Sequence, residues 1–516
     1  MRALQWLATF VGRRWGGLTV ITAFALSRVA LAHLADLRFD NIPLNVSLQL
    51  LDRGHLREDL VGSVIHLHSQ PPLFNLLIGL GLRAPLHLET PLFHALYLAV
   101  GLGTTVCLYA LLRRVGVPTV VAVVVTLVFT SSPSFFLYET WLHYDQLVMF
   151  LLCLSALALL RYEESGRARH AAVFLTLVAA VVLTRSLFHL VWFMAWPVVL
   201  LARRGVDRRR LLSAMALPVV VVVGLQVHRL VTFGTPSLSS LVGISLAKIT
   251  TFQLSESERR DLVGRGEISP VSLVEPLSPP ASYEGLVPTP RPTGVPALDE
   301  DLKGFYRSPL TDDFFRMNLN SMVFLEVSNQ YRNDALHVIR TRPGAYVKGV
   351  ARAVEIFFRP TSDVFAFAQN RDRVGSLDRF YNRAVFGVAA PGKAAEGIPP
   401  AHLGYIEGPA RTAWFVVAAY VAALVGGAFT LLRRARRRDE GGGSLLTIGF
   451  LWLTTLYVFV FSNTLEVGEN NRFRLYSDPL VIALLAALVV RWHRGRAERI
   501  DARPLDRRRQ SQKWVR

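Results

Sequence analysis

Long apolar runs, separated by shorter polar stretches, dominate the chain. A helix needs about 20 residues to cross the hydrocarbon core of a bilayer, and several of these runs reach that length. Lipid offers the backbone no hydrogen-bond partners, so the runs are expected to be helices. They also lack the alternation that marks the strands of an outer-membrane barrel. The pattern predicts about ten transmembrane helices, near residues 16–35, 91–112, 117–132, 146–161, 170–184, 187–202, 211–230, 411–432, 445–462 and 477–492.

The polar stretches between these runs fall into two groups by their arginine content. Basic loops stay in the cytoplasm, which assigns to that side the stretches 113–114, 161–170, 203–210 and 433–438 and the tail from residue 491. Both termini are then cytoplasmic, in a multi-pass protein of the inner (plasma) membrane. The external loops are 36–90, 133–145, 184–187, 231–410 and 463–476. A single kinked helix over 170–202 is the alternative, and it would invert every later loop.

Four regions follow from this topology. They are an N-terminal transmembrane catalytic module with the first two external loops (1–235), a large external segment (236–410), C-terminal transmembrane helices (411–492) and a basic cytoplasmic tail (493–516). The external segment has a proline-rich middle that cannot form regular helix. Its later part, 345–358, has the spacing of an amphipathic helix, which either lies on the membrane or packs on the rest of the segment. The prediction is an all-α polytopic membrane protein with a mixed external segment.

Composition supports this class. The 516-residue chain is 52% hydrophobic and 18% charged, whereas soluble proteins carry about 25% charged residues. A net charge of +19 would suggest nucleic acid for a soluble domain, but here the arginines lie between spans, so no nucleic-acid partner is expected. Cys107 and Cys153 both lie in apolar runs, which excludes a disulfide framework or a cysteine-based zinc site from the external part.

The first external loop holds the most informative residues. Asp40 comes just after the first span, and His66, His68 and Gln70 precede the diproline Pro71-Pro72 about thirty residues later. Ionisable groups close to the membrane usually mark function. Asp40 is therefore predicted to be catalytic; a loop or capping carboxylate is the alternative, and Asp36 is the nearest rival. The histidines fit substrate contacts or ordinary hydrogen bonds. A divalent metal on the His-x-His pair stays open, although no cofactor is predicted.

Other external loops add charged residues at the same depth relative to the membrane. The second loop carries Glu139 and Asp145, the short loop carries Arg185, and the last loop carries Arg472 and Arg474. Asp145 is predicted to be catalytic or to cap the following helix, and the arginines bind phosphate or anchor at the interface. Arginines hold a lipid-linked sugar phosphate, and a carboxylate can take the proton of an acceptor hydroxyl.

The order and spacing of these motifs resemble the GT-C superfamily of polyprenyl-phosphate-sugar-dependent glycosyltransferases. The chain is most similar to the group that contains protein O-mannosyltransferases and the aminoarabinose transferase of lipid A. The similar residues are Asp40, Pro71-Pro72-Leu73-Phe74, Tyr144-Asp145, Thr184-Arg185 and the stretch from Arg472 to Pro479. Two positions depart from the family. Asn41 replaces an acid, and Gln70 replaces a lysine whose role Arg185 or Arg472 would take over.

The resemblance implies transfer of a sugar from a polyprenyl-phosphate donor to a hydroxyl of a lipid, cell-wall glycan or protein on the external face. Asp40 would be the general base and Asp145 a second catalytic residue, and membrane lipids would surround the protein. The implied substrate-binding residues are His66, His68, Gln70, Glu139, Arg185, Arg472 and Arg474. An O-antigen polymerase or ligase-like enzyme is one alternative. A transporter or flippase is another, but the chain lacks the paired repeats of transporters.

Overall fold

The computed structural model describes residues 2–203, 206–235, 237–304, 316–389, 411–437 and 445–512. The regular elements of this part are all helices, and its β pairing consists of isolated bridges. The predicted class, an all-α multi-pass membrane protein, is confirmed. The external segment was expected to be mixed; in its described residues it is built from helices and connecting loops instead.

Seven helices in the described residues are long and apolar enough to cross a membrane. They are α1 (Arg2–Leu34), α6 (Leu86–Val115), α9 (Asp145–Ser165), α12 (Arg208–Phe233), α21 (Trp414–Arg437), α22 (Leu445–Leu465) and α23 (Asn470–Gln512). An eighth span results if α7 (Thr119–Thr130) and α8 (Pro133–Glu139), which meet at a 60° bend, are one broken span. The count of about ten therefore stays a prediction.

The two remaining predicted spans form shorter apolar helices. These are α10 (Ala168–Thr184) and α11 (Leu190–Leu201). Residues 185–189 between them are not helical, so the region is two helices rather than one kinked helix. α10 packs against α9 and α12, and this packing buries Phe174 and Val178. The break places Arg185 directly after the last residue of α10, where its side chain is buried.

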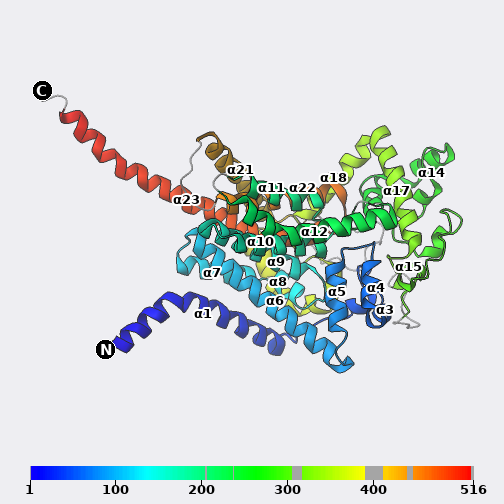
Figure 1. Ribbon diagram of the computed structural model, residues 1–516, viewed down its shortest axis with the longest axis horizontal. Helices are drawn as coiled ribbons and strands as arrows, with labels where there is room; N and C mark the ends of the chain where they lie inside the picture. The colour runs from blue at the N-terminus through cyan, green and yellow to red at the C-terminus, as the bar shows by residue number, and fades with distance from the viewer. Residues whose placement is uncertain are drawn as a thin grey trace.

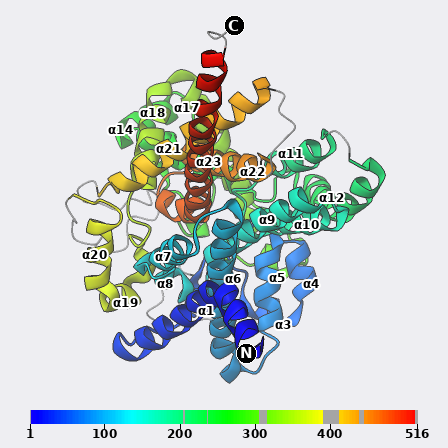
Figure 2. The same cartoon turned by 90° about the vertical axis from the view of Figure 1, so that its left-hand side faces the viewer.

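Helix α23 is central to the bundle. It packs against α6, α9, α21 and α22, and Figure 2 shows it surrounded by the other spans. It then continues as helix through most of the basic tail, to Gln512. Because α23 contacts so many helices, residues in its first turn can meet side chains from several parts of the chain.

Both ends of the chain lie at one end of the molecule, and the first-loop helices gather at the other with α14 (Glu256–Gly264), α15 (Pro296–Asp299) and α17 (Met322–Thr341) of the external segment (Figure 1). The first loop contains α2 (Pro43–Val46), α3 (Arg53–Glu58), α4 (Leu60–Ile65) and α5 (Pro72–Gly81). The external segment also contains α13 (Val242–Ile249), α18 (Pro343–Phe357), α19 (Ala368–Arg371) and α20 (Gly375–Ala384). Short 3-10 turns are η1 (Thr251–Gln253), η2 (Pro270–Leu273), η3 (Pro280–Tyr283), η4 (Phe365–Phe367) and η5 (Asp372–Val374).

Helix α18 corresponds to the predicted amphipathic helix. It packs against α17 and α13 of the external segment and also against the spans α22 and α23. Its buried residues include Ala353, Ile356 and Phe357, whereas Val347 is 63% exposed. One face of α18 therefore packs both on the spans and on the external segment.

Glycines allow α13 to approach its neighbours closely. A Cβ on Gly243 would lie 1.7 Å from the Ser328 carbonyl oxygen of α17. A Cβ on Gly349 of α18 would lie 2.0 Å from the Ile249 carbonyl oxygen. No other residue fits at either contact, because a carbonyl oxygen of a packed helix cannot move aside. The two contacts fix α13 between α17 and α18.

Candidate functional site

A cavity of about 180 Å³ lies where four distant parts of the chain meet. They are the first loop, the break between α10 and α11, helix α13, and the loop between α22 and α23. Its charged and amide-bearing lining includes Gln70, Arg185, Lys248, Glu466, Glu469 and Arg472. Apolar side chains such as Leu187, Phe461 and Phe473 complete the wall. The cavity thus joins a polar part to an apolar part.

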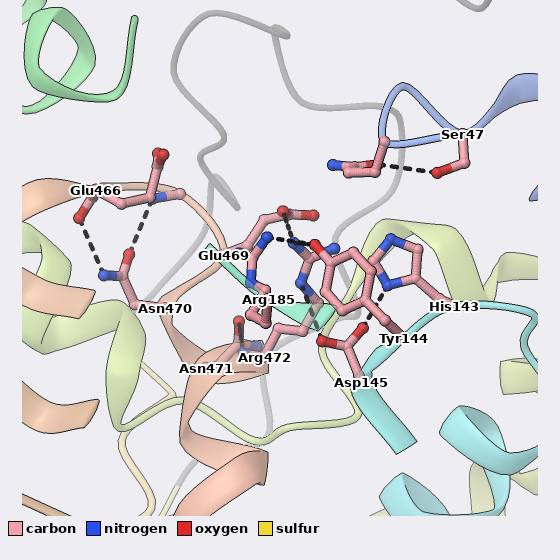
Figure 3. A network of polar contacts seen from close by, with 12 residues as sticks. Ser47, His143, Tyr144, Asp145, Arg185, Glu466, Glu469, Asn470, Asn471 and Arg472 are labelled. Carbon is pink, nitrogen blue, oxygen red and sulfur yellow. Dashed lines mark hydrogen bonds and ion pairs between the residues drawn. The ribbon is translucent and has the colours of Figure 1, made fainter. Parts of the chain in front are cut away.

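Two arginines converge on one tyrosine at the wall of this cavity (Figure 3). Arg185 donates to the Tyr144 hydroxyl at 2.5 Å, and its guanidinium carbon lies 4.8 Å from the centre of the Tyr144 ring. Arg472 Nη2 lies 3.5 Å from the same hydroxyl. Both arginines are buried, and the Nε atom of each has no hydrogen-bond partner. Arg472 Nε faces Asp145 at 3.8 Å, but each guanidinium carries five N–H donors, more than its hydrogen bonds use. The pair therefore keeps donor capacity for an anion in the cavity.

Asp145, the first residue of α9, lies behind Arg472 and is fully buried. One carboxylate oxygen lies 2.6 Å from His143 Nδ1. The other accepts from the Tyr476 hydroxyl and lies 3.8 Å from Arg472 Nε. The N-cap residue of α9 is Tyr144 and not Asp145, so the capping interpretation is wrong. Asp145 contacts the cavity only through Arg472.

Glu469 forms a second ion pair with Arg472. Its carboxylate lies 2.8 Å from Arg472 Nη2, and 28% of its side chain is exposed. Arg472 is thus held between a buried and a partly exposed carboxylate, which fixes its position in the first turn of α23. His143 is fixed in turn, because its ring stacks on Trp141 with centroids 4.2 Å apart.

Asp40 lies beside this network without lining the cavity. Its backbone pairs with Trp141, through Asp40 N–H to the Thr140 carbonyl at 2.7 Å and Leu142 N–H to the Asp40 carbonyl at 3.1 Å. Its carboxylate accepts from the Ile42 N–H at 2.9 Å. The side chain is half-buried, and this burial raises the pKa of Asp40 above 3.8. The structure therefore brings Asp40 to the second loop, next to the residues that lead to Asp145.

The two predicted histidines face protein rather than the cavity. His68 is fully buried, with Nδ1 2.7 Å from the Ser240 hydroxyl and Nε2 2.8 Å from the Asn320 carbonyl. Burial lowers the pKa of His68 to about 3, so the ring is neutral. His66 Nδ1 lies 2.8 Å from the Gly62 carbonyl of its own helix. Among the described residues, no three His, Cys, Asp or Glu side chains are grouped so that they could hold a metal ion.

Three further predicted residues separate into different environments. Gln70 lines the cavity. Glu139 forms a bidentate ion pair with Arg28 of α1, at 2.8 Å and 3.0 Å. Arg474 donates to the carbonyls of Phe357 and Arg359 at the end of α18, where basic side chains are favourable. Glu139 and Arg474 thus hold helices together and do not line the cavity.

Other cavity residues were missed by the sequence analysis. Ser245 and Lys248 of α13 line the cavity and contact Glu466. The signal that could have found Lys248 is its charge inside the apolar stretch Val242–Ile249. No family model, curated protein or solved structure matches the chain.

Asn320 ties the first loop to the external segment, and its loss should be measurable. Its side-chain oxygen accepts from the N–H groups of His68 and Ser69. Asn320→Ala leaves both donors buried without a partner, and we expect the free energy of unfolding to fall by about 1–3 kcal/mol. Unfolding in a denaturant titration of the purified protein measures this. Asn333→Ala, on the exposed face of α17, is the matched control, and equal stability of the two variants would contradict the prediction.

Proposed function

We propose that the protein transfers a sugar from a polyprenyl-phosphate-linked donor to a hydroxyl acceptor on the external face of the membrane. The convergence of Arg185 and Arg472 on one point of a partly apolar cavity supports the proposal. Guanidinium groups bind phosphate through paired hydrogen bonds, and the apolar wall suits the start of a prenyl chain. The arginine-rich loops favour cytoplasmic termini, and both ends of the chain lie at the end opposite α14, α15 and α17 of the external segment (Figure 1).

The proposed reaction breaks one bond and forms one. The acceptor oxygen attacks the anomeric carbon of the donor while the bond from that carbon to the phosphate oxygen breaks. The electron pair stays on the leaving polyprenyl phosphate, whose added charge Arg185 and Arg472 stabilise. The sugar passes through an oxocarbenium-like state. The acceptor proton goes to a general base.

Asp40 fits the base better than the neighbouring carboxylates do. Glu139, Asp145, Glu466 and Glu469 each form an ion pair with an arginine or lysine. Among the described residues, none forms an ion pair with Asp40 at salt-bridge distance. A cation stabilises the ionised form and weakens the base, whereas partial burial raises the pKa of Asp40 and strengthens it.

Asp40→Asn tests this assignment. The amide cannot take a proton, so we expect the transfer rate to fall by about 10²–10⁴-fold while binding of polyprenyl phosphate is kept. Glycan and lipid analysis of a deletion strain first identifies the missing sugar and its acceptor. The rate is then measured with that acceptor, and the variant is also tested for restoring the missing product in the strain.

Asp36→Asn is the matched control for this test. Asp36 lies in the same loop, is exposed, and forms surface ion pairs with Arg38 and Arg373, which contribute little. Its backbone has φ of 47°, a conformation that asparagine also tolerates. Asp36→Asn should restore the product. If Asp40→Asn, present at the wild-type level, also restores it fully, Asp40 is not the base.

A further inference from the structure

Next to the two arginines, the cavity has a second polar group made by α13 and the loop before α23. Glu466 accepts from the Lys248 ammonium at 2.5 Å and from the Ser245 hydroxyl at 2.6 Å. The Lys248 and Glu466 side chains are 11% and 21% exposed, and both line the cavity. A carboxylate has about four acceptor sites and an ammonium has three donors. The Lys248–Glu466 pair therefore still offers donors and acceptors side by side.

Gln70 brings an unpartnered acceptor to the same cavity. Its side chain lines the cavity, the residue is 8% exposed, and Oε1 is buried without a hydrogen-bond partner. Its backbone is held in place, because Arg229 Nη2 donates to the Gln70 carbonyl at 3.0 Å. A buried amide oxygen without a partner is unfavourable. A ligand hydroxyl in the cavity would satisfy it.

The charges of this second group favour a neutral ligand. Lys248 is compensated by Glu466, so an added phosphate or carboxylate would approach a carboxylate without gaining a free cation. A ring with neighbouring hydroxyls can donate to Glu466, Gln70 and the Ser245 oxygen and accept from Lys248, because the Ser245 proton is already donated to Glu466. The cavity also has room for a ring, since about 180 Å³ is more than ten times the 10–15 Å³ that one water requires.

We infer that Gln70, Ser245, Lys248 and Glu466 form the subsite for the sugar ring of the donor, and that this sugar is a neutral hexose or pentose. The inference rests on the proposed function, because it places the sugar beside the phosphate held by Arg185 and Arg472. The subsite is preformed, since the glycine contacts at residues 243 and 349 fix α13. It also gives the external segment a direct part in choosing the donor.

Binding of a set of lipids to the full-length protein in nanodiscs tests the subsite. The probes are polyprenyl phosphate alone and polyprenyl phosphates that carry glucose, mannose, galactose, arabinose or glucuronic acid, and native mass spectrometry gives each dissociation constant. For wild type, we expect at least one neutral sugar to tighten binding about tenfold or more over the sugar-free lipid, as two to three added hydrogen bonds would. The lipid that carries glucuronic acid should bind no more tightly than the sugar-free lipid.

Two variants should remove this preference without weakening binding of the sugar-free lipid. They are Gln70→Leu and the double variant Lys248→Met/Glu466→Gln, which leaves the net charge of the cavity unchanged. We expect the sugar preference to fall to about threefold or less in each, as the loss of one or two hydrogen bonds predicts. Gln226→Leu is the matched control, because Gln226 of α12 also has a buried unpartnered oxygen but does not line the cavity. It should keep the full preference.

The outcomes separate the two proposals. If wild type binds the sugar-free lipid but no neutral sugar tightens binding, or if Gln70→Leu keeps the preference, the subsite is overturned and the proposed function stands. A preference for the lipid that carries glucuronic acid overturns the inference that the donor sugar is neutral. If wild type binds none of the lipids, the proposed function itself fails, and the subsite fails with it.

Discussion

Arg185→Gln is expected to lower the rate of sugar transfer by about 10²–10³-fold, the usual effect of removing one donor that stabilises charge in a transition state. Arg185 lies at the break between α10 and α11, and its guanidinium donates to the Tyr144 hydroxyl. Glutamine removes the positive charge that meets the leaving phosphate. The initial rate of transfer to the acceptor found by glycan analysis measures the effect.

The substitution is a clean test because Arg185 has no carboxylate within salt-bridge distance among the described residues. Removing it leaves no buried anion unpaired, so the fold should survive, which thermal unfolding checks. Arg185→Lys keeps the charge without the paired donors, so its transfer rate should lie between those of wild type and Arg185→Gln. Arg260→Gln, at an exposed position on α14, is the control. An Arg185→Gln rate equal to that of wild type would exclude Arg185 from phosphate binding.

The positions of several cavity residues could be predicted from the sequence. Gln70, Arg185 and Arg472 are polar residues at the edges of apolar runs, and basic loops placed those edges on one side. Arginine content predicts which loops share one face of the membrane, and these three residues do line one cavity. The same reasoning also selected Glu139 and Arg474, which form hydrogen bonds to other helices and do not line the cavity. Which charge finds which partner depends on how each helix is rotated, and apolar patterning inside a bundle does not set that rotation.

The contribution of α13 could not be predicted. It is eight residues long and follows a stretch with no clear periodicity. Its place is fixed by long-range backbone contacts at Gly243 and Gly349, which a sequence shows only as two glycines. The number of spans was uncertain for a related reason. Apolar length identifies α6 or α9, but α10 and α11 are short and the bend between α7 and α8 divides one run.

Asp145→Asn is expected to lower the free energy of unfolding by about 3 kcal/mol, near the lower limit for removing one partner of a buried ion pair. The amide keeps only one acceptor oxygen for the two groups, His143 and Tyr476, that contact the carboxylate, and it no longer offsets the buried charge of Arg472. An SDS titration followed by tryptophan fluorescence measures the change. Asp145→Asn/Arg472→Gln should cost less than the sum of the two single variants, by about 1–2 kcal/mol. Strict additivity would show that the two residues do not interact.

The same variant separates a positioning role from a catalytic one. A general base works only when deprotonated, so the rate is full above its pKa and is lost as the pH falls through it. Burial raises the pKa of Asp40, which puts this acid limb above the ordinary aspartate value of 3.8. If Asp145 acts only by holding Arg472, Asp145→Asn lowers the rate at every pH and leaves the acid limb in place. Asp40→Asn should abolish the limb. Loss of the limb in Asp145→Asn instead would make Asp145 the base, because only the titrating group can remove its own pKa from the profile.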